Sequence, residues 1–520
     1  MPPSSFIPTR LLDVAEHDLK LVETSELDKS EGHKWCALSY VWGADVLLKT
    51  TKATQFAHKE CIPLDSLPKT LKDAVSVCRG MGFRYLWIDA LCIIQDDQED
   101  LREELSHMPE VYQYAGLTIC AASSTSIHDG FLYQRGYWSH MLPATTIRIA
   151  TDSGDSISLF VYLFLCTLAF IRRPEPISRR AWTYQEDMLS PRMLNYRTHH
   201  LEWKCKTHAE LVGAPRFDFF KTSTNKFDRS EKEQDGGLMT TPGTYRLSSL
   251  ITWREVIVEY SHRKASLATD RLRALSAIAR AYHLETGKEY LAGLWKEDVP
   301  GALCWANGFI PLSEEDRIYG LLTSQRPKEY RAPSWSWASL ETPVHFWGSY
   351  ESYTPEARVI QGVQVLDAGI TATYPGGEFD SIASGFLVLQ APVWVLELPT
   401  PAKMHEFRVE DPTTRHSYME CDDLCARVWP DTIEDSQEMV DTLWFLLLAE
   451  IENDYGPGLN GESHTTYCGL VLKEAKGFAD TCSRIGYFKT WPLPCELLNK
   501  TFFTPAMFLD LFEDRTITLI

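Results

Sequence analysis

The stretch RYLWIDALCIIQDD, residues 84–97, decides the fold class. Residues 85–91 form a short apolar run that is typical of a buried strand, and polar residues follow it. Just before it, residues 66–82 carry apolar side chains at gaps of three and four, which predicts an amphipathic helix. Residues 99–115 repeat that spacing after the strand, and we expect Pro109 to kink or restart this second helix.

Two more apolar runs predict strands on either side of this unit. They are WCALSYVW at residues 35–42, which ends at Gly43, and LTICAA at residues 117–122. Strand, helix, strand, helix, strand at these lengths predicts an α/β fold with a mostly parallel sheet. The three strands should be neighbours in that sheet.

The rest of the chain changes character twice. Residues 221–244 are polar and charged, residues 247–286 have a helical apolar pattern, and alternating runs such as FLVLQAPVWVL at 386–396 indicate antiparallel strands. We therefore predict four parts: an α/β domain at 1–210, a polar loop or linker at 211–245, a helical region at 246–330 and a β-rich region at 331–520.

The run SWSW at residues 334–337 suggests how the two halves are related. If it is a strand, its two tryptophans lie on one face and need a large apolar partner. This predicts that the C-terminal half packs on the N-terminal domain.

Composition limits the function. The formal net charge of -20 argues against binding nucleic acid, which needs an electropositive surface. The 13 cysteines, without a CxxC pair, are typical of free thiols in a reducing compartment, and residues 1–14 lack a secretory signal pattern, so we expect a cytoplasmic protein. The uncharged run at 157–171 is shorter than the roughly 20 residues of a membrane span, which favours a buried strand or helix over insertion.

Two patterns superficially resemble a metal site and a nucleotide-binding motif, and neither predicts such a site. Cys421 and Cys425, with His405 and His416 upstream, match no standard zinc spacing, so we predict no metal site. The segment GPGLNG at 456–461 satisfies GxGxxG, but a polar strand rather than a helix follows it, so we interpret it as a turn.

Three blocks resemble the heterokaryon-incompatibility (HET) domain of fungi: ALSYVWG at 37–43, RYLWIDALCIIQDD at 84–97 and RRAWTYQEDMLSPRML at 179–194. The second half also resembles longer members of this family, through DRLRALSAIA at 270–279, YLAGLW at 290–295, APSWSWAS at 332–339 and RIGYF at 484–488. Leu101 departs from the pattern, which has Trp there. The resemblance implies a protein of fungal non-self recognition that triggers programmed cell death.

Polar residues at the predicted strand ends form a candidate site, because ligands of parallel α/β sheets gather beyond the carboxyl ends of the strands. Asp89 is a candidate catalytic carboxylate, although it could instead cap a helix or loop. Cys92 allows a thiol nucleophile, but its apolar context favours core packing. The candidate substrate-binding residues at these strand ends are Ser39, Tyr40, Trp42, Gly43, Cys92 and Gln95.

A third segment adds a second carboxylate. Trp182 and Gln185 share a helical face, Glu186 lies beside it, and a carboxylate next to an indole is desolvated, which suits acid–base work. We predict Glu186 as catalytic and the other two as substrate-binding. The alternative is that Glu186 pairs with Arg179 or Arg180 and only stabilises the start of the helix.

The HET domain in turn is similar to Toll/interleukin-1 receptor (TIR) domains, flavodoxin-like modules whose first strand ends in Ser-Tyr, as Ser39 and Tyr40 do here. Some TIR domains cleave the nicotinamide–ribose bond of NAD with one glutamate and no metal. This resemblance implies NAD as substrate, no cofactor, Glu186 as the catalytic carboxylate and Trp182 beside the leaving nicotinamide.

Two other functions fit the same motifs. One is a non-catalytic signalling module that self-associates, and the other is a small-molecule enzyme of a metabolic gene cluster. If the chain acts as a HET protein, we expect activation by a protein partner or by self-association, and we expect no membrane partner.

Overall fold

The computed structural model describes residues 6–28, 33–43, 48–135, 145–150, 156–161, 175–205, 208–212, 250–265, 267–307, 325–346, 358–397, 419–421, 426–432, 434–435, 442–452, 465–490 and 504–520. The chain divides into two compact units, Met1–Tyr245 and Arg246–Ile520. Four sequence predictions fall wholly or partly outside the described residues. They are the polar loop at 221–244, the turn at 456–461, the cysteine and histidine pattern at His405, His416 and Cys425, and the part of the apolar run that follows residue 161.

An eight-stranded sheet organises the first unit, in the order β10-β9-β8-β5-β3-β4-β1-β2. Its four central strands are parallel, and two antiparallel strands flank them on each side. The central strands are β8 (Arg192–Tyr196), β5 (Leu117–Cys120), β3 (Trp35–Ser39) and β4 (Tyr85–Trp87). The flanking strands are β1 (Arg10–Asp13), β2 (Lys20–Glu23), β9 (Leu201–Cys205) and β10 (His208–Val212).

Helices lie against both faces of this sheet. Along β3, Trp35 donates from its indole to the carbonyl of Val111 in α4, whereas Cys36 faces Cys78 of α2. The alternation follows from the two-residue period of a strand. The helices are α1 (Gln55–Glu60), α2 (Lys69–Gly80), α3 (Asp89–Cys92), α4 (Gln98–Tyr114) and α6 (Trp182–Leu189).

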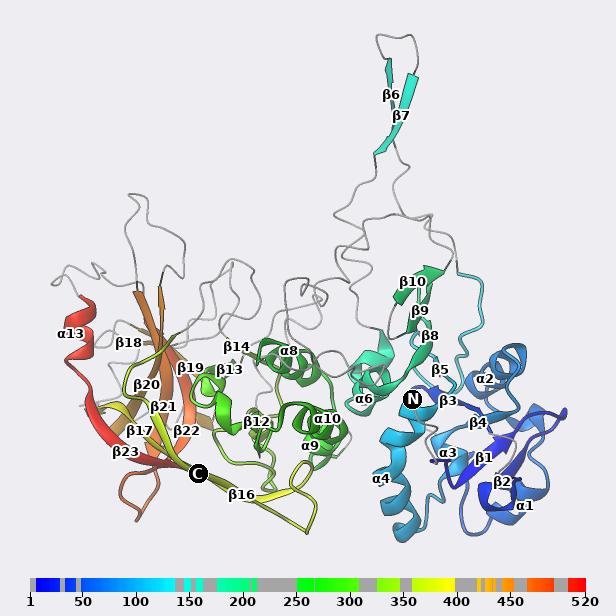
Figure 1. Cartoon of the computed structure of the whole chain (residues 1–520), viewed down its shortest axis with the longest axis horizontal. Helices are drawn as coiled ribbons and strands as arrows, with labels where there is room; N and C mark the ends of the chain where they lie inside the picture. Colours follow the sequence, from blue (N-terminus) through cyan, green and yellow to red (C-terminus); the bar gives the residue numbers. More distant parts are fainter. Residues whose placement is uncertain are drawn as a thin grey trace. The chain divides into compact units, whose positions relative to one another are not determined.

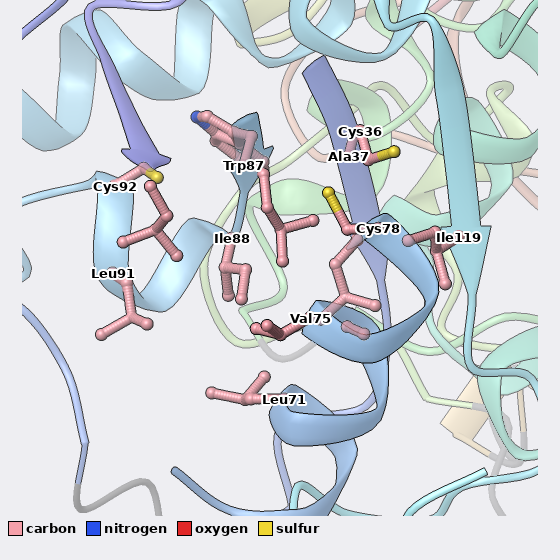
Figure 2. Packing of buried hydrophobic residues seen from close by; sticks show 14 of the residues in the cluster. Cys36, Ala37, Leu71, Val75, Cys78, Trp87, Ile88, Leu91, Cys92 and Ile119 are labelled. Carbon is pink, nitrogen blue, oxygen red and sulfur yellow. The ribbon is translucent and has the colours of Figure 1, made fainter. Parts of the chain in front are cut away.

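The apolar face of α2 closes one side of the core. Leu71, Val75 and Cys78 follow one another along this helix at gaps of three and four (Figure 2). They are buried together with Ile88, which follows β4, and Ile119, which lies in β5. The helical spacing in the sequence therefore identified the buried face correctly.

The prediction of three neighbouring strands is confirmed. β3 lies between β4 and β5, parallel to both (Figure 1). Two details differ from the sequence prediction. α4 is one helix that runs through Pro109 rather than restarting there, and β4 ends at Trp87, so that Asp89 begins the short helix α3.

The uncharged run at 157–171 begins as a strand. β7 (Ser156–Val161) pairs antiparallel with β6 (Thr145–Ala150) in a separate two-stranded sheet. Within the described part of the chain, no helix is both long and apolar enough to cross a membrane.

The second unit begins with helices, as predicted, but the expected helical region is divided. α8 (Leu250–Ser261), α9 (Asp270–Arg273) and α10 (Ser276–Thr286) replace one long pattern. Two small antiparallel sheets follow, a hairpin of β11 (Tyr290–Leu291) with β12 (Leu294–Trp295), and the pair β13 (Trp305–Asn307) and β14 (Val344–Phe346).

A nine-stranded sheet forms the rest of this unit and confirms the β-rich C-terminal region. All its pairings are antiparallel except that of β22 with β23, and the pairings close a ring through β17, β20, β21, β22 and β23 (Figure 1). The elements are β15 (Arg358–Val359), β16 (Gln364–Ala372), β17 (Ile382–Glu397), β18 (Met419–Cys421), β19 (Ala426–Pro430), β20 (Thr442–Glu452), β21 (Thr465–Glu474), β22 (Thr481–Thr490), α13 (Pro505–Leu509) and β23 (Glu513–Leu519).

The tryptophans of the SWSW run are buried inside this second unit. Trp335 and Trp337 are both 0% exposed, and the Trp337 indole donates to the carbonyl of Gly293 at 3.0 Å. The segment is not a strand, because a 3-10 helix begins at Trp337. The ring of Trp337 meets Tyr260 of α8 edge-on within the same unit, and the packing of the C-terminal half on the N-terminal domain stays a prediction.

A buried ion pair joins several segments of the second unit. The guanidinium of Arg484 in β22 binds both carboxylate oxygens of Asp431, at 2.9 and 3.1 Å, and both side chains are 0% exposed. Its remaining donors reach the carbonyls of Leu303 and Trp305, and it lies 3.2 Å from the centroid of the Trp305 ring. The RIGYF block at 484–488 thus includes a structural arginine.

We predict that Arg484→Met destabilises the second unit by about 3–5 kcal/mol, because it leaves the Asp431 carboxylate buried without its main partner. Urea unfolding of the full chain measures this. Lys296→Met is the control, since its ion pair with Glu289 is solvent-exposed and should contribute little. Equal stability of the two variants would contradict the structural role of Arg484.

Candidate active site

Polar side chains meet where the central parallel strands of the first unit end. Ser39 is the last residue of β3, Asp89 follows β4, and Glu186 lies in α6. The hydroxyl of Ser39 donates to Oε2 of Glu186 at 2.5 Å. We call the group that gathers here the strand-end cluster; it consists of Ser39, Tyr40, Trp42, Asp89, Tyr112, Arg180 and Glu186.

Glu186 is a buried carboxyl group whose protonation is finely balanced. It is 6% exposed, and burial, opposed by the Ser39 hydrogen bond, raises its pKa to about 7. The charge of Arg180 and the nearby hydroxyl of Tyr112 also lower this pKa, whereas the charge of Asp89 raises it. Near neutral pH, Glu186 therefore populates both its protonated and its ionised form.

Asp89 is partly exposed and is held by two hydrogen bonds. Its Oδ2 accepts from the indole of Trp42 at 2.8 Å, and its Oδ1 accepts from the backbone N–H of Ala90 at 2.7 Å. Burial raises its pKa, and the charge of Arg180 opposes that shift. Asp89 can therefore bind the start of α3, as considered from the sequence, and also lie beside Glu186.

Arg180 is the cation of the cluster. Its Nη1 donates to the backbone carbonyl of Tyr40 at 2.5 Å, and its charge lowers the pKa of both Asp89 and Glu186. From the sequence alone, Arg180 is predicted only as a possible partner of Glu186 that stabilises the start of the helix. Its contact with the end of β3 could not be read from helical spacing, because 140 residues separate the two.

Two tyrosines complete the cluster. The Tyr112 hydroxyl donates to the carbonyl of Leu38 at 3.0 Å and lies close enough to Glu186 to lower its pKa. The Tyr40 hydroxyl is buried without a hydrogen-bond partner among the described residues, yet it lies close enough to Asp89 for each to shift the pKa of the other. Burial raises the pKa of Tyr40, so this phenol stays protonated. In the sequence, Tyr112 is one of the residues of the amphipathic helix predicted at 99–115, and nothing there marks it as part of a site.

Gly43 has a backbone role at this site. Its φ is +82°, and a Cβ at this position would lie 2.8 Å from the Cβ of Ser126. Glycine is therefore needed for the turn that follows Trp42. The structure gives no side-chain reason to count Gly43 among the binding residues.

Gln95 and Cys92 do not join the strand-end cluster. The amide of Gln95 donates to the carbonyls of Asp89 and Ile93, at 3.0 and 3.2 Å, so it supports the backbone of α3. Cys92 is 0% exposed in the hydrophobic core (Figure 2), and burial raises its pKa to about 12. A thiol in this position neither ionises at neutral pH nor offers a surface to a substrate, so the structure corrects its assignment as a binding residue.

Trp182 and Gln185 lie on α6 beside Glu186. Trp182 is half-buried and packs against the core of the first unit. Gln185 is buried, and its carbonyl oxygen has no hydrogen-bond partner among the described residues. Their roles as substrate-binding residues stay predictions.

This geometry defines the class of protein: an α/β domain whose parallel strands end at two neighbouring carboxyl groups, one buried and one partly exposed. Residues 35–186 match the family model described as heterokaryon incompatibility protein (HET). The chain therefore contains a HET domain, which implies a role of the heterokaryon-incompatibility type. The match begins at the first residue of β3 and ends at Glu186, so it includes the whole strand-end cluster.

The other comparisons add no relative. No curated protein and no solved structure matches the chain, so similarity to TIR or flavodoxin-like folds stays a prediction. Among the residues that the structure describes, no group of three or more His, Cys, Asp or Glu side chains could hold a metal ion.

The raised pKa of Glu186 predicts a pH-dependent gain in stability for Glu186→Gln. Glutamine imitates the neutral acid, so it avoids the free energy of ionising a buried group, roughly 3 kcal/mol for a pKa of about 7 against an unfolded value of 4.5. The variant should be more stable than wild type above pH 7. The difference should shrink as the pH falls from 7 to 4.5 and vanish below that, as followed by thermal unfolding. A difference that is independent of pH would show that Glu186 does not titrate in this range.

Proposed function

We propose that the HET domain of this protein cleaves the nicotinamide–ribose bond of NAD, and that the loss of NAD brings about the cell death of an incompatibility response. One observation carries this proposal: the buried Glu186 carboxyl, hydrogen-bonded to Ser39 at the end of the central strand. A desolvated carboxylate with a pKa near 7 suits a reaction that develops positive charge on a sugar ring.

The reaction needs little beyond such a carboxylate. As the bond between C1′ of the ribose and N1 of the pyridinium breaks, its electron pair goes to the nitrogen, and neutral nicotinamide leaves without protonation. The ionised Glu186 stabilises the oxocarbenium-like ribose. A water oxygen then bonds to C1′, and Glu186 accepts the proton of that water and passes it to solvent.

Charge favours the oxidised form of the dinucleotide as substrate. Asp89 and Glu186 lie close enough for the charge of one to raise the pKa of the other, and Arg180 is the cation that offsets them. A pyridinium ring adds a positive charge next to two carboxyl groups, which a neutral dihydropyridine does not. The half-buried indole of Trp182, on the same helix as Glu186, is a candidate to stack on that ring.

Two further points support the wider proposal. The resemblance of HET domains to TIR domains, some of which cleave NAD with one glutamate, favours this chemistry by analogy of fold. Nine cysteines in the described part of the chain are free thiols, which fits a reducing compartment such as the cytoplasm. We propose activation by a protein partner or by self-association, without nucleic acid.

Glu186→Gln should abolish both NAD loss and toxicity when the full chain is overexpressed. The substitution keeps the shape of the side chain and the hydrogen bond from Ser39 but removes the charge that stabilises the ribose cation. Cellular NAD and colony survival measure the two effects. Glu175→Gln is a matched control, because Glu175 is another buried carboxylate of the same unit, bound to Thr198 outside the cluster, and it should leave both effects intact.

One result would replace the enzymatic proposal. If Glu186→Gln still kills cells, and the wild-type chain consumes no NAD even when it is artificially oligomerised, the domain acts as a self-associating signalling module. If the purified chain instead converts another metabolite, this would favour the alternative function of a small-molecule enzyme.

The pH dependence of NAD cleavage should report on the neighbours of Glu186. Because the carboxylate is the active form, the rate should rise with pH through about 7. Ser39→Ala removes a hydrogen bond that lowers this pKa, so the rise should move to higher pH. Asp89→Asn removes a charge that raises it, so the rise in its residual activity should move to lower pH. Shifts in the same direction would contradict the assignment of Glu186 as the titrating group.

A further inference from the structure

The helix that begins with Asp89 has only one turn and cannot satisfy its own carbonyl groups. A helix leaves its last four carbonyls without partners in the helix, and α3 has four residues, Asp89–Cys92. The first carbonyl, that of Asp89, is bound by the N–H of Ile93 and by the amide of Gln95. The other three are buried, so each of them needs a donor from elsewhere in the fold.

Thr50 and Arg10 supply those donors. The backbone N–H of Thr50 binds the carbonyl of Ala90 at 2.9 Å, and its hydroxyl donates to the carbonyl of Leu91 at 2.6 Å. The Nε of Arg10 in β1 donates to the carbonyl of Cys92 at 2.7 Å. Thus two residues distant in sequence hold the last three carbonyls of α3.

Thr50 also binds the segment that follows α3. Its carbonyl accepts from the backbone N–H of Gln95 at 2.8 Å, and the amide of Gln95 returns to the carbonyl of Asp89. All three polar groups of Thr50 are therefore bonded to residues 90–95, and the residue itself is 0% exposed.

The hydroxyl of Thr50 has a second partner, which fixes its direction. The carbonyl of Leu91 can only accept, so the hydroxyl must donate to it. Nδ1 of His58, 2.9 Å from the same oxygen, must then be the donor, which places the hydrogen of the neutral ring on Nδ1. Because Nδ1 keeps this hydrogen when the ring is protonated, the hydroxyl stays directed at Leu91 in both forms.

We propose that Thr50 is a positioning residue for the strand-end cluster: its hydroxyl holds the α3 turn in the place where Asp89 accepts a hydrogen bond from Trp42. The Asp89 side chain leaves the first residue of the turn, so a displacement of the turn moves its carboxylate. The indole of Trp42 reports on that position, because its N–H lies 2.8 Å from Oδ2 of Asp89. Thr50 lies outside every block that resembles the HET family.

The first test uses the full chain labelled with 5-fluorotryptophan and follows the ¹⁹F resonance of Trp42, assigned with Trp42→Phe. Thr50→Val and Thr50→Ala remove the hydroxyl and should shift or broaden this resonance. Thr50→Ser keeps the hydroxyl and should restore the wild-type position. If Thr50→Val does not fold, Thr50→Ala decides, since it introduces no new atoms.

Thr24→Val is the matched control. Thr24 is also buried, and its hydroxyl donates to the carbonyl of Pro8 at 2.6 Å, so this variant loses the same kind of bond away from α3. It should leave the Trp42 resonance unchanged even if it lowers the melting temperature. An unchanged Trp42 resonance in both Thr50→Val and Thr50→Ala, or an equal shift in Thr24→Val, would overturn the proposal.

A second readout rests on the proposed function. If the chain cleaves NAD, Thr50→Ala should lower kcat about tenfold with less effect on KM, and Thr50→Ser should stay within twofold of wild type. A tenfold loss in Thr24→Val as well would show a general effect of destabilisation and count against the positioning role. A wild-type chain that does not cleave NAD contradicts the proposed function, whereas the fluorine spectra still decide the role of Thr50.

Discussion

The burial of the Glu186 carboxyl against the end of β3 is the constraint on which the rest of the site depends. Removing a carboxyl group from water disfavours its charged form and raises its pKa, and the neighbouring groups set the size of that shift. Ser39 and Arg180 favour the charged form, whereas Asp89 opposes it. The balance leaves a group that changes protonation near neutral pH. Ser39 comes from β3, Asp89 from α3, Tyr112 from α4 and Glu186 from α6, so the site exists only when these four elements are assembled.

The parallel sheet explains why these elements meet. The carboxyl ends of β3, β4 and β5 lie at one edge, and the residues that follow each strand share that edge. Behind it, donors from Arg10 and Thr50 hold the short α3 turn, and the packed face of α2 closes the core. Rigid support of this kind allows a few polar groups to keep a defined geometry, which either catalysis or a specific signalling contact requires.

The second unit uses its polar groups differently. Its fully buried Arg484 and Asp431 neutralise each other and bind backbone carbonyls, so they join strands rather than present reactive groups. In Glu186 burial leaves the charge only partly compensated, whereas in the pair of Arg484 and Asp431 the compensation is direct and bidentate. This difference separates a structural ion pair from a candidate site, although Glu186 and the ion pair are all buried.

The sequence by itself predicted three neighbouring parallel strands, the two helices between them with the buried face of α2, the HET domain, and the presence of Ser39, Asp89 and Glu186 at the ends of strands or on a helix beside them. Periodicity and motif spacing are local properties, and they sufficed for these conclusions. Only the tertiary structure decided that Cys92 lies in the core, that Gln95 supports a backbone turn, and that Arg180, Tyr112 and Thr50 contribute to the site. These outcomes depend on contacts between residues far apart in the chain, for example Ser39 with Glu186 across 147 positions, and on burial, which sets a pKa but leaves no pattern in the sequence.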